Sequence, residues 1–414
     1  MIRVIQTTMA NNFYEGNLKS KRMQRLMTLM CALATASAHA GEGGGPEYSG
    51  SGFLSLAAGK MLGGSRGNVG DFNCPCYVSD YAQAAIYDGR SGLQWGPDSK
   101  LGVQGSASFD SERLSFTAQA VSRGASNGKA DLEWLYGSYK LNDKITLQAG
   151  RQRLPMFYYS DAQDIGVALP WTHLPTWLYG WQAVNYNGAK IRYQDQFDGW
   201  SAIVNLLAGN EHRQNSGYWK VYGNGRQSIT DVNWTNIVGG DLTLSKNWLE
   251  TRIVYIQSNT QDNNLNQVWN YTTLTYDPAT GVGPVAQQKI YGLTVKADYR
   301  DWQFYNEFIY INHPGLTYKD FSQNIAVGYR YGKWLPMATW GHYRGTVVTD
   351  GVLPGAPAST ANSQQTTSLS LRYDLTTSSD LKLQYDDTTD SSDPGFAPRY
   401  GRSRLLTFAY DRVF

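Results

Sequence analysis

The side chains of this chain that could do chemistry are few, and their spacing fits no catalytic or metal site. Residues 63–67, Gly-Gly-Ser-Arg-Gly, match the G-x-S-x-G pattern of serine hydrolases, but they lie in a glycine-rich stretch without a strand-to-helix elbow. Four histidines, His173, His212, His313 and His342, lack the paired spacing of zinc ligands. We therefore expect no catalysis, no bound metal and no cofactor.

Two cysteines, Cys74 and Cys76, are separated by one proline. In an oxidising compartment such a pair can close as a small disulfide. One intervening residue strains that ring, so a structural disulfide or no bond at all is favoured over a redox-active pair.

The stretch from Arg151 to Trp181 gathers charge, proline and aromatic rings without a period of 2 or 3.6 residues. A long irregular segment inside a regular protein is usually functional or disordered, and the aromatic content argues against disorder. Its charged side chains are two bases and two acids, and we treat these four as candidate site residues: Arg151, Arg153, Asp161 and Asp164.

The first 40 residues form an N-terminal extension and a signal peptide, expected to be cleaved after Ala40. Basic residues precede an apolar run from Leu26 to Ala36, and Ala-His-Ala at 38–40 is a small-x-small cleavage pattern. A membrane anchor is the alternative, but the run is shorter than the roughly 20 residues of a membrane helix. Because residues 1–40 hold five bases and one acid, the net charge of the remaining 41–414 falls from +2 to −2, which does not suggest nucleic acid.

The rest of the chain alternates apolar and polar residues in segments joined by two kinds of connection. Seven connections are short, eight are long, and the two kinds alternate strictly. Short turns on one side and long loops on the other are typical of an outer-membrane barrel. The short ones are 110–112, 141–144, 195–198, 245–247, 299–301, 331–333 and 375–380. We therefore predict an all-β fold, a 16-stranded antiparallel transmembrane barrel over residues 41–414.

One face of the expected strands carries charge and the other is apolar. From Ile290 to Tyr299, for example, Leu293 and Val295 alternate with Thr294 and Lys296. We expect the polar face to line a wet lumen, with a third extracellular loop, 151–181, folded inward. The candidate basic residues of the lumen wall are Lys190, Arg192, Arg252, Lys296, Arg330, Arg372 and Lys382.

Opposed charges on loop and wall would create a transverse field that favours polar solutes and tunes ion selectivity. Two other interpretations stay open. The wall charges can be merely solvated side chains, or Arg151 and Arg153 can pin the loop by pairing with Asp161 or Asp164.

Aromatic residues cluster beside the short turns, as in the belts of membrane proteins: Tyr139, Trp200, Trp248, Tyr299, Trp302, Tyr331 and Trp334. A soluble sandwich with these rings in its core is the alternative, but it needs neither strand pairs nor a secretion signal.

The last strand, 402–414, ends on Phe414 in register with Tyr410, Phe408 and Leu406. It resembles the terminal strand of Gram-negative outer-membrane proteins, from which only Arg412 departs.

Residues 150–155 and 160–171 are similar to the third-loop region of the Gram-negative porin superfamily, although the short acidic motif of enteric general porins is absent. The resemblance implies an outer-membrane homotrimer surrounded by lipid and lipopolysaccharide, whose C-terminal Phe414 is recognised by the barrel assembly machinery. It also implies a water-filled channel for ions and small hydrophilic solutes.

Two rival functions remain. One is a substrate-specific channel for a sugar or an organic anion, in which the rings of the 151–181 stretch form a slide: Phe157, Tyr158, Tyr159, Trp171, Trp177 and Trp181. The other is a non-conducting surface adhesin. An outer-membrane hydrolase is disfavoured because no credible Ser, His and Asp spacing exists.

Overall fold

The computed structural model describes residues 45–414 except 91, 110–112, 315–317, 348–358 and 394–397. The expected signal at residues 1–40 and its cleavage after Ala40 lie outside this part. Among the described residues, no helix has the length and apolar character that crossing a membrane requires.

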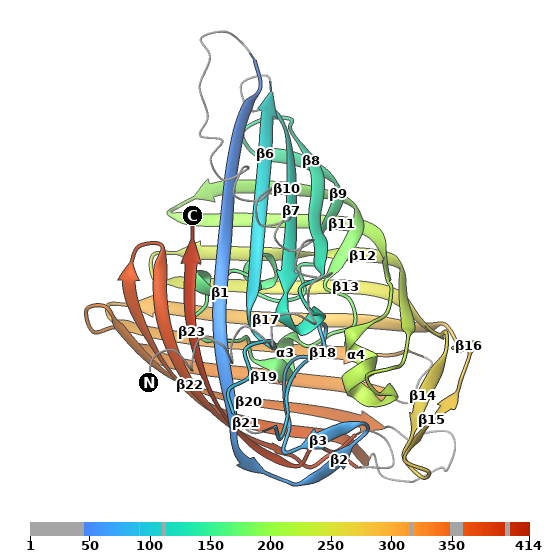
Figure 1. Ribbon diagram of the computed structural model, residues 1–414. Helices are drawn as coiled ribbons and strands as arrows, with labels where there is room; N and C mark the ends of the chain where they lie inside the picture. The colour runs from blue at the N-terminus through green and yellow to red at the C-terminus, as the bar shows by residue number, and fades with distance from the viewer. Residues whose placement is uncertain (1–44, 91, 110–112, 315–317, 348–358, 394–397) are drawn as a thin grey trace, which may run out of the picture.

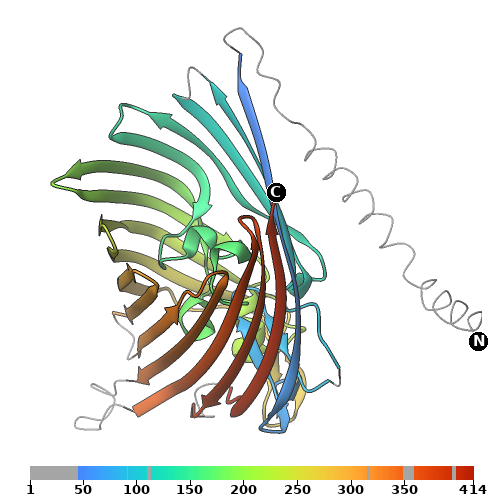
Figure 2. The same cartoon turned by 90° about the vertical axis from the view of Figure 1, so that its left-hand side faces the viewer.

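A single antiparallel sheet of sixteen strands closes on itself, as predicted (Figures 1 and 2). Neighbouring strands in the chain pair with each other all round the ring, and β1 closes it by pairing with both β6 and β23. The strands of the ring are β1 (Glu47–Gly64), β6 (Lys100–Phe109), β7 (Leu114–Arg123), β8 (Ala130–Lys140), β9 (Ile145–Arg153), β10 (Asn185–Phe197), β11 (Trp200–Arg213), β12 (Thr230–Lys246), β13 (Leu249–Asn264), β17 (Ala286–Tyr299), β18 (Trp302–Asn312), β19 (Tyr318–Tyr329), β20 (Trp334–Val347), β21 (Ser359–Thr376), β22 (Ser379–Asp390) and β23 (Arg402–Val413).

The remaining elements are short and lie in the long connections. They are β2 (Gly67–Val69), β3 (Phe72–Cys74), β4 (Tyr77–Asp80), β5 (Ala85–Tyr87), β14 (Gln267–Asn270), β15 (Thr275–Pro278), β16 (Gly281–Val282), α3 (Thr176–Tyr179), α4 (Gly217–Trp219) and the single turns η1 (Gly124–Ser126), η2 (Ser160–Ala162), η3 (Gly166–Ala168) and η4 (Lys220–Asn224).

Closure depends on the unusual length of β1. Its first half, Glu47–Ser55, pairs with β6, and its second half, from Phe53 onward, pairs with β23. Phe414 continues this pairing, because its backbone N–H donates to the Gly52 carbonyl at 2.9 Å and its own carbonyl accepts from Gly52 at 2.7 Å. No strand of the described ring is therefore left with a free edge.

The short connections are hairpin turns at the predicted positions, except that residues 110–112 lie outside the described chain. At the turn between β10 and β11, Asp198 and Gly199 both have positive φ angles, 47° and 71°. Two successive left-handed residues match the right-handed twist of the flanking strands.

The outer face of the barrel is an apolar belt. Ile253 on β13 is 51% exposed and lies between Leu242 and Leu293 of the neighbouring strands, with Phe308 next in the row. The aromatic residues beside the short turns are largely exposed too, and Trp248 packs edge-on against Tyr299. This alternation confirms the predicted orientation of the strands, because apolar groups face lipid only on a membrane barrel.

We predict that Ile253→Arg destabilises the barrel by roughly 2–4 kcal/mol, because a guanidinium at the middle of the apolar belt must leave water. Asn259→Arg, on the same face of the same strand but nearer the long loops, is the matched control and should cost about 0–1 kcal/mol. Urea-dependent folding into lipid vesicles measures both. Equal losses would contradict the assignment of the belt.

Candidate functional site

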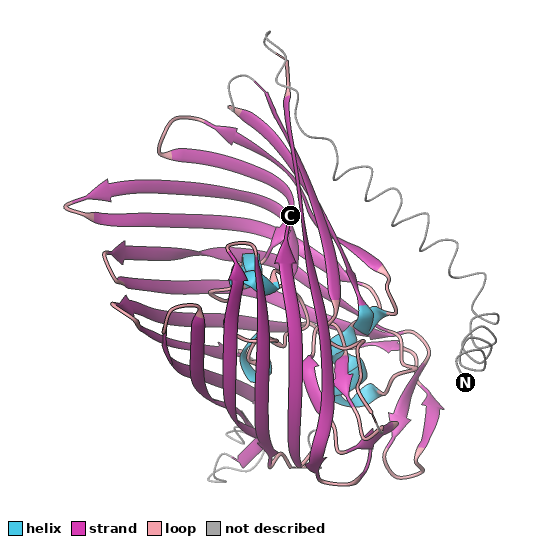
Figure 3. Cartoon of the chain, turned by 60° about the vertical axis from the view of Figure 1, so that its left-hand side comes forward, coloured by secondary structure: helices cyan, strands magenta, loops and turns pink. Residues whose placement is uncertain are grey.

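The connection between β9 and β10, residues 154–184, crosses the inside of the barrel, and Figure 3 shows short helical turns within the ring of strands. Three basic residues of the wall hold its backbone. Arg252 donates to the carbonyl groups of Phe157 and, at 2.8 Å, Pro155. Arg372 donates to Val167 at 2.6 Å and to Leu169 at 3.0 Å, while Lys382 donates to Gly166 at 2.6 Å.

An apolar cluster fixes the same loop against β10, β11, β12, β13, β17 and β18. The buried loop side chains include Met156, Phe157 and Leu178, and the wall contributes ten residues: Tyr186, Leu207, Val232, Trp234, Ile237, Val254, Ile256, Ile290, Ile309 and Ile311. Burying each large apolar side chain contributes about 1.5–3 kcal/mol. The expected wet lumen is therefore wrong for this sector, because apolar loop and wall residues exclude water from it.

Two indole rings complete the docking. Trp171 Nε1 donates to Thr339 Oγ1 at 2.9 Å, and Trp177 Nε1 donates to the Gln323 carbonyl at 3.1 Å. The Trp177 ring lies directly on Gly341 of β20, where a Cβ atom would fall 1.7 Å from it. Both rings are buried, so the aromatic residues of the loop mainly anchor it and do not form a continuous exposed slide.

Asp164 is buried in an ion-pair cluster and faces no open water. Its carboxylate contacts Arg153, lies 2.7 Å from Arg123 Nη2 and 3.7 Å from Lys100 Nζ. Glu133 bridges the same two guanidinium groups at 2.6 Å and 3.0 Å. Burial alone would raise the pKa of Asp164, but the surrounding cations hold it below its usual range.

The other candidate arginine of the loop, Arg151, lies at the end of β9 and binds elsewhere. It forms a two-pronged ion pair with Glu211 of β11, at 2.8 Å and 2.9 Å. The loop is thus pinned through Arg153 and Asp164, whereas Arg151 joins β9 to β11 across β10.

His173 is enclosed by carboxylates from two directions. Its Nδ1 lies 3.1 Å from Oδ2 of Asp98, in the first long connection (residues 65–99, between β1 and β6). Its Nε2 lies 3.4 Å from Asp386 Oδ2 on β22. Burial lowers the pKa of His173, but the two carboxylates outweigh it and raise the pKa to about 10. The imidazolium therefore ties the loop both to the wall and to the first long connection.

The sequence candidates separate into two groups. Arg252, Arg372 and Lys382 hold the loop, and the Lys382 side chain is 0% exposed between Asp380 and Asp411. The partly exposed cations are Lys190, Arg192, Lys296 and Arg330. Lys296 pairs with Asp298 at 2.9 Å and Arg330 with Asp374 at 2.6 Å.

Asp161 is the exposed acid of the loop. Within the described part of the chain, Asp161 forms no ion pair.

The wall from β6 to β10 differs from the opposite wall, because several polar inward side chains in its middle are partly exposed: Gln104, Ser106, Thr117, Ser138 and Gln148. The same wall also carries the buried Arg123, Glu133 and Tyr186 and the partly exposed cations Lys190 and Arg192. Cross-strand bonds join its polar side chains, such as Gln119 to Gln104 at 3.0 Å and Gln148 to Ser138 at 3.0 Å. Inward residues of β19 to β23 are instead buried under the loop, including Ser322, Thr339, Gln384 and Thr407. Water therefore has access along this part of the lumen wall, from β6 to β10.

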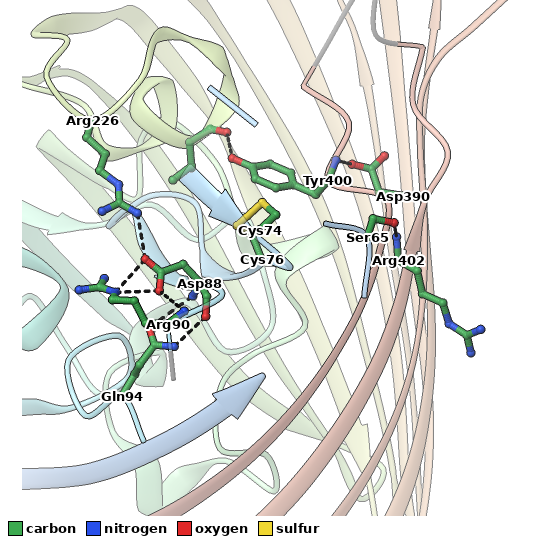
Figure 4. Close-up of a disulfide and its surroundings, with 11 residues drawn as sticks. Ser65, Cys74, Cys76, Asp88, Arg90, Gln94, Arg226, Asp390, Tyr400 and Arg402 are labelled. Atoms are coloured by element: carbon green, nitrogen blue, oxygen red, sulfur yellow. Dashed lines mark hydrogen bonds and ion pairs between the residues drawn. A yellow bond between two sulfur atoms is a disulfide. The ribbon is translucent and has the colours of Figure 1, made fainter. Parts of the chain in front are cut away.

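The first long connection covers the crossing loop at the end of the barrel where the long connections lie. Cys74 and Cys76 are bonded, with a Cα–Cα distance of 4.5 Å, in an apolar cluster with Tyr400 (Figure 4). Asp88 nearby accepts from Arg90 at 2.7 Å and from Arg226 at 3.2 Å.

Ser65 of the G-x-S-x-G match lies between β1 and β2, with no helix after it, and its hydroxyl accepts from the Arg402 N–H at 2.9 Å. The described residues contain no group of three or more His, Cys, Asp and Glu side chains that could hold a metal ion.

Sequence reasoning missed several partners of the loop, chiefly Arg123, Glu133, Asp98 and Asp386. A signal existed for Glu133, which interrupts the apolar residues Leu132 and Trp134 at a bulge in β8. Charged residues near strand ends otherwise look like solvated rim residues, so Arg123, Asp98 and Asp386 carried no distinctive pattern.

No protein-family model matches the chain, and no curated protein sequence matches it. Several solved structures match its fold. The outer-membrane channel DcaP of Acinetobacter baumannii is 11% identical, with a TM-score of 0.55 over 91% of this chain and 100% of that one. The anion-selective porin from Comamonas acidovorans is 11% identical, with a TM-score of 0.53 over 89% and 100%. The trimer form of OmpT, an outer-membrane protein of Vibrio cholerae, is 8% identical, with a TM-score of 0.52 over 89% and 99%.

The chain has a porin-like fold. Its closed barrel and apolar belt place it in the outer membrane of a Gram-negative bacterium, as predicted. Identities this low carry no residue's role from these proteins to the porin-like barrel, so its site must be argued from its own side chains.

We predict that His173→Gln destabilises the protein by roughly 3–5 kcal/mol near pH 6, because it leaves two buried carboxylates uncompensated. The folded-state pKa of about 10 lies above the unfolded value of about 6.5, so the stabilisation is complete below pH 6.5 and is lost as pH rises through 10. The difference in unfolding midpoint between wild type and variant should therefore shrink toward pH 10. A difference in unfolding midpoint that stays constant with pH would contradict the assignment of His173 as a buried imidazolium.

Proposed function

We propose that this chain forms a passive, water-filled channel for ions and small hydrophilic solutes in the outer membrane. The observation that carries the proposal is the uneven docking of residues 154–184: the loop covers the wall from β11 to β23, while the wall from β6 to β10 keeps several partly exposed polar side chains. The hydroxyl and amide groups of this wall offer hydrogen bonds to passing solutes without trapping them. No covalent step is part of this proposal.

The proposed constriction is formed by Asp161, the exposed acid of the loop, and by the partly exposed Lys190 and Arg192, which lie one pleat apart on the same face of β10. An acid and two bases across a narrow water path act on each ion that passes, and both signs are present. Arg151, Arg153 and Asp164 support the constriction from within the protein and do not meet solute.

We propose a homotrimer surrounded by outer-membrane lipid and lipopolysaccharide, with OmpT of Vibrio cholerae in its trimer form as the supporting precedent. The barrel assembly machinery is a further proposed partner, through Phe414 at the closing seam beside Gly52.

Deletion of residues 160–168 should raise single-channel conductance in a planar bilayer, because it removes Asp161 and the part of the loop that narrows the water path. An equally long deletion at 270–278, in the β14–β15 hairpin at the far end of the barrel (Figure 1), is the control and should leave conductance unchanged. Unchanged conductance after the deletion of residues 160–168 would show that the loop does not form the constriction.

Charge substitutions at the constriction should shift ion selectivity in opposite directions. Asp161→Asn should move the reversal potential in a KCl gradient toward anions, and Lys190→Gln should move it toward cations. Both shifts should be larger at 0.1 M than at 1 M salt, because the screening length falls from about 10 Å to about 3 Å. Asp71→Asn, in the first long connection, is the control. A reversal potential that is unchanged in both Asp161→Asn and Lys190→Gln would refute this constriction.

A further inference from the structure

A polar groove lies on the outer face of the barrel, beside strands β20 to β23 and near the long connections. It leaves room of about 510 Å³, which is the size of many small-molecule sites. Side chains that donate and accept hydrogen bonds form most of its lining, and they include His342, Gln365, Thr367, Asp387, Thr389 and Arg402.

The strand register places this groove directly beyond the apolar belt. Leu369, which is 56% exposed on the outer face, pairs with Tyr385, and Tyr385 pairs with Leu406. The next outward row toward the long connections is Thr367, Asp387 and Arg404, and the row after it is His342, Gln365, Thr389 and Arg402. A surface against hydrocarbon is apolar, so these polar rows lie at the depth of the lipid headgroups.

The groove and its margin are positively charged. Arg402, Arg404 and Lys60 are exposed on the outer face of β23 and β1, where Lys60 pairs with Leu406. On the same rows of β22, Asp387 is the acid, and it lies 2.7 Å from Arg402 and 3.7 Å from Arg404. Three bases and one acid give these strands a net charge of +3 − 1 = +2 at the groove.

Asp387 orients the two guanidinium groups without occupying all their donors. Arg402 donates to both carboxylate oxygens, at 3.1 Å from Nε and 2.7 Å from Nη2. A guanidinium has further N–H donors, and the side chains of Arg402 and Arg404 are 54% and 44% exposed. Figure 4 shows the Arg402 side chain extending away from the Tyr400 ring. Donors held in this way suit an oxyanion such as a phosphate group.

We propose that this groove binds the phosphorylated sugar headgroup of a lipopolysaccharide molecule. The long connections of an outer-membrane barrel face the cell exterior, which is the side on which lipopolysaccharide lies. Its phosphate groups complement Arg402, Arg404 and Lys60, and its sugar hydroxyl groups match the neutral amide and hydroxyl groups of the groove. Its acyl chains then continue along Leu369 and the apolar belt.

No other occupant matches all three features of this surface. Free phosphate matches only the cations, because it has neither sugar hydroxyl groups nor acyl chains. A second copy of the chain would have to bring acids to these arginines. The inference rests on the proposed lipopolysaccharide surroundings of the barrel and is independent of conduction.

The test measures binding of fluorophore-labelled rough lipopolysaccharide to the purified full barrel in detergent, by fluorescence anisotropy. We expect saturable binding that weakens about tenfold or more when the lipid A phosphates are removed enzymatically. Inorganic phosphate at the same concentration should not displace the labelled lipid, because it lacks the sugar and acyl contacts.

Substitutions in the groove should shift this affinity in both directions. Arg402→Gln combined with Arg404→Gln should weaken binding about tenfold or more, because it removes charged donors to phosphate. Asp387→Asn should strengthen binding, because it removes the acid that competes with the phosphate. The matched control is Lys289→Gln combined with Lys319→Gln, which removes the same charge from β17 and β19 outside the groove and should bind as wild type does.

Heat-modifiable migration in gels confirms that each variant is a folded barrel. Unchanged binding by the folded arginine double variant, equal binding of dephosphorylated lipid, displacement by inorganic phosphate or equal weakening in the lysine control would each overturn the proposal. Loss of the trimer in the arginine variant with unchanged lipid binding would assign the groove to a second copy of the chain instead. A barrel that binds lipopolysaccharide in this way but passes no current would refute the channel and leave this site standing.

Discussion

A chain that crosses the inside of a barrel without regular structure must find partners for its backbone carbonyl groups, and this constraint shapes the whole interior. Arg252, Arg372 and Lys382 meet it by donating to five loop carbonyls. Because these cations are bound to backbone and to neighbouring carboxylates, they are not available to solutes. The same wall adds an apolar sector, so that polar and apolar contacts fix the loop together.

The docking is one-sided, and this asymmetry links the fold to the proposed function. On one side the wall is buried and the loop behaves like the core of a soluble protein. On the other side short hydroxyl and amide chains remain in reach of water. Asp161 is the only exposed acid of the loop in the described chain. His173 and Asp164 extend the anchoring to the first long connection and to the ends of β7 and β8.

The sequence alone was sufficient for the barrel but not for its interior. Period-2 alternation, as in Ile290–Tyr299, sets which side of each strand faces lipid, and turn spacing sets the strand count. The docking of the loop had a visible sign that sequence reasoning passed over. Residues 253–256 and 308–311 are apolar on both faces, whereas a strand between lipid and water is expected to be apolar only on its lipid face. Charged residues could be placed on the inner face, but not divided into water-facing and loop-holding groups. That division depends on where an irregular loop lies, which no period encodes.

The central claim is that the loop is permanently docked and that solutes pass beside it. Thr172 of the loop and Thr407 of β23 place their hydroxyl oxygens 2.8 Å apart, so Thr172→Cys with Thr407→Cys should form a disulfide without moving the backbone. The decisive measurement is the single-channel conductance of this double variant, oxidised and reduced, with the wild type under the same reductant as control for Cys74–Cys76. Our account predicts equal conductance in both states and in the wild type. A conductance that falls or vanishes on oxidation would show that the loop must move for solutes to pass, and would contradict it.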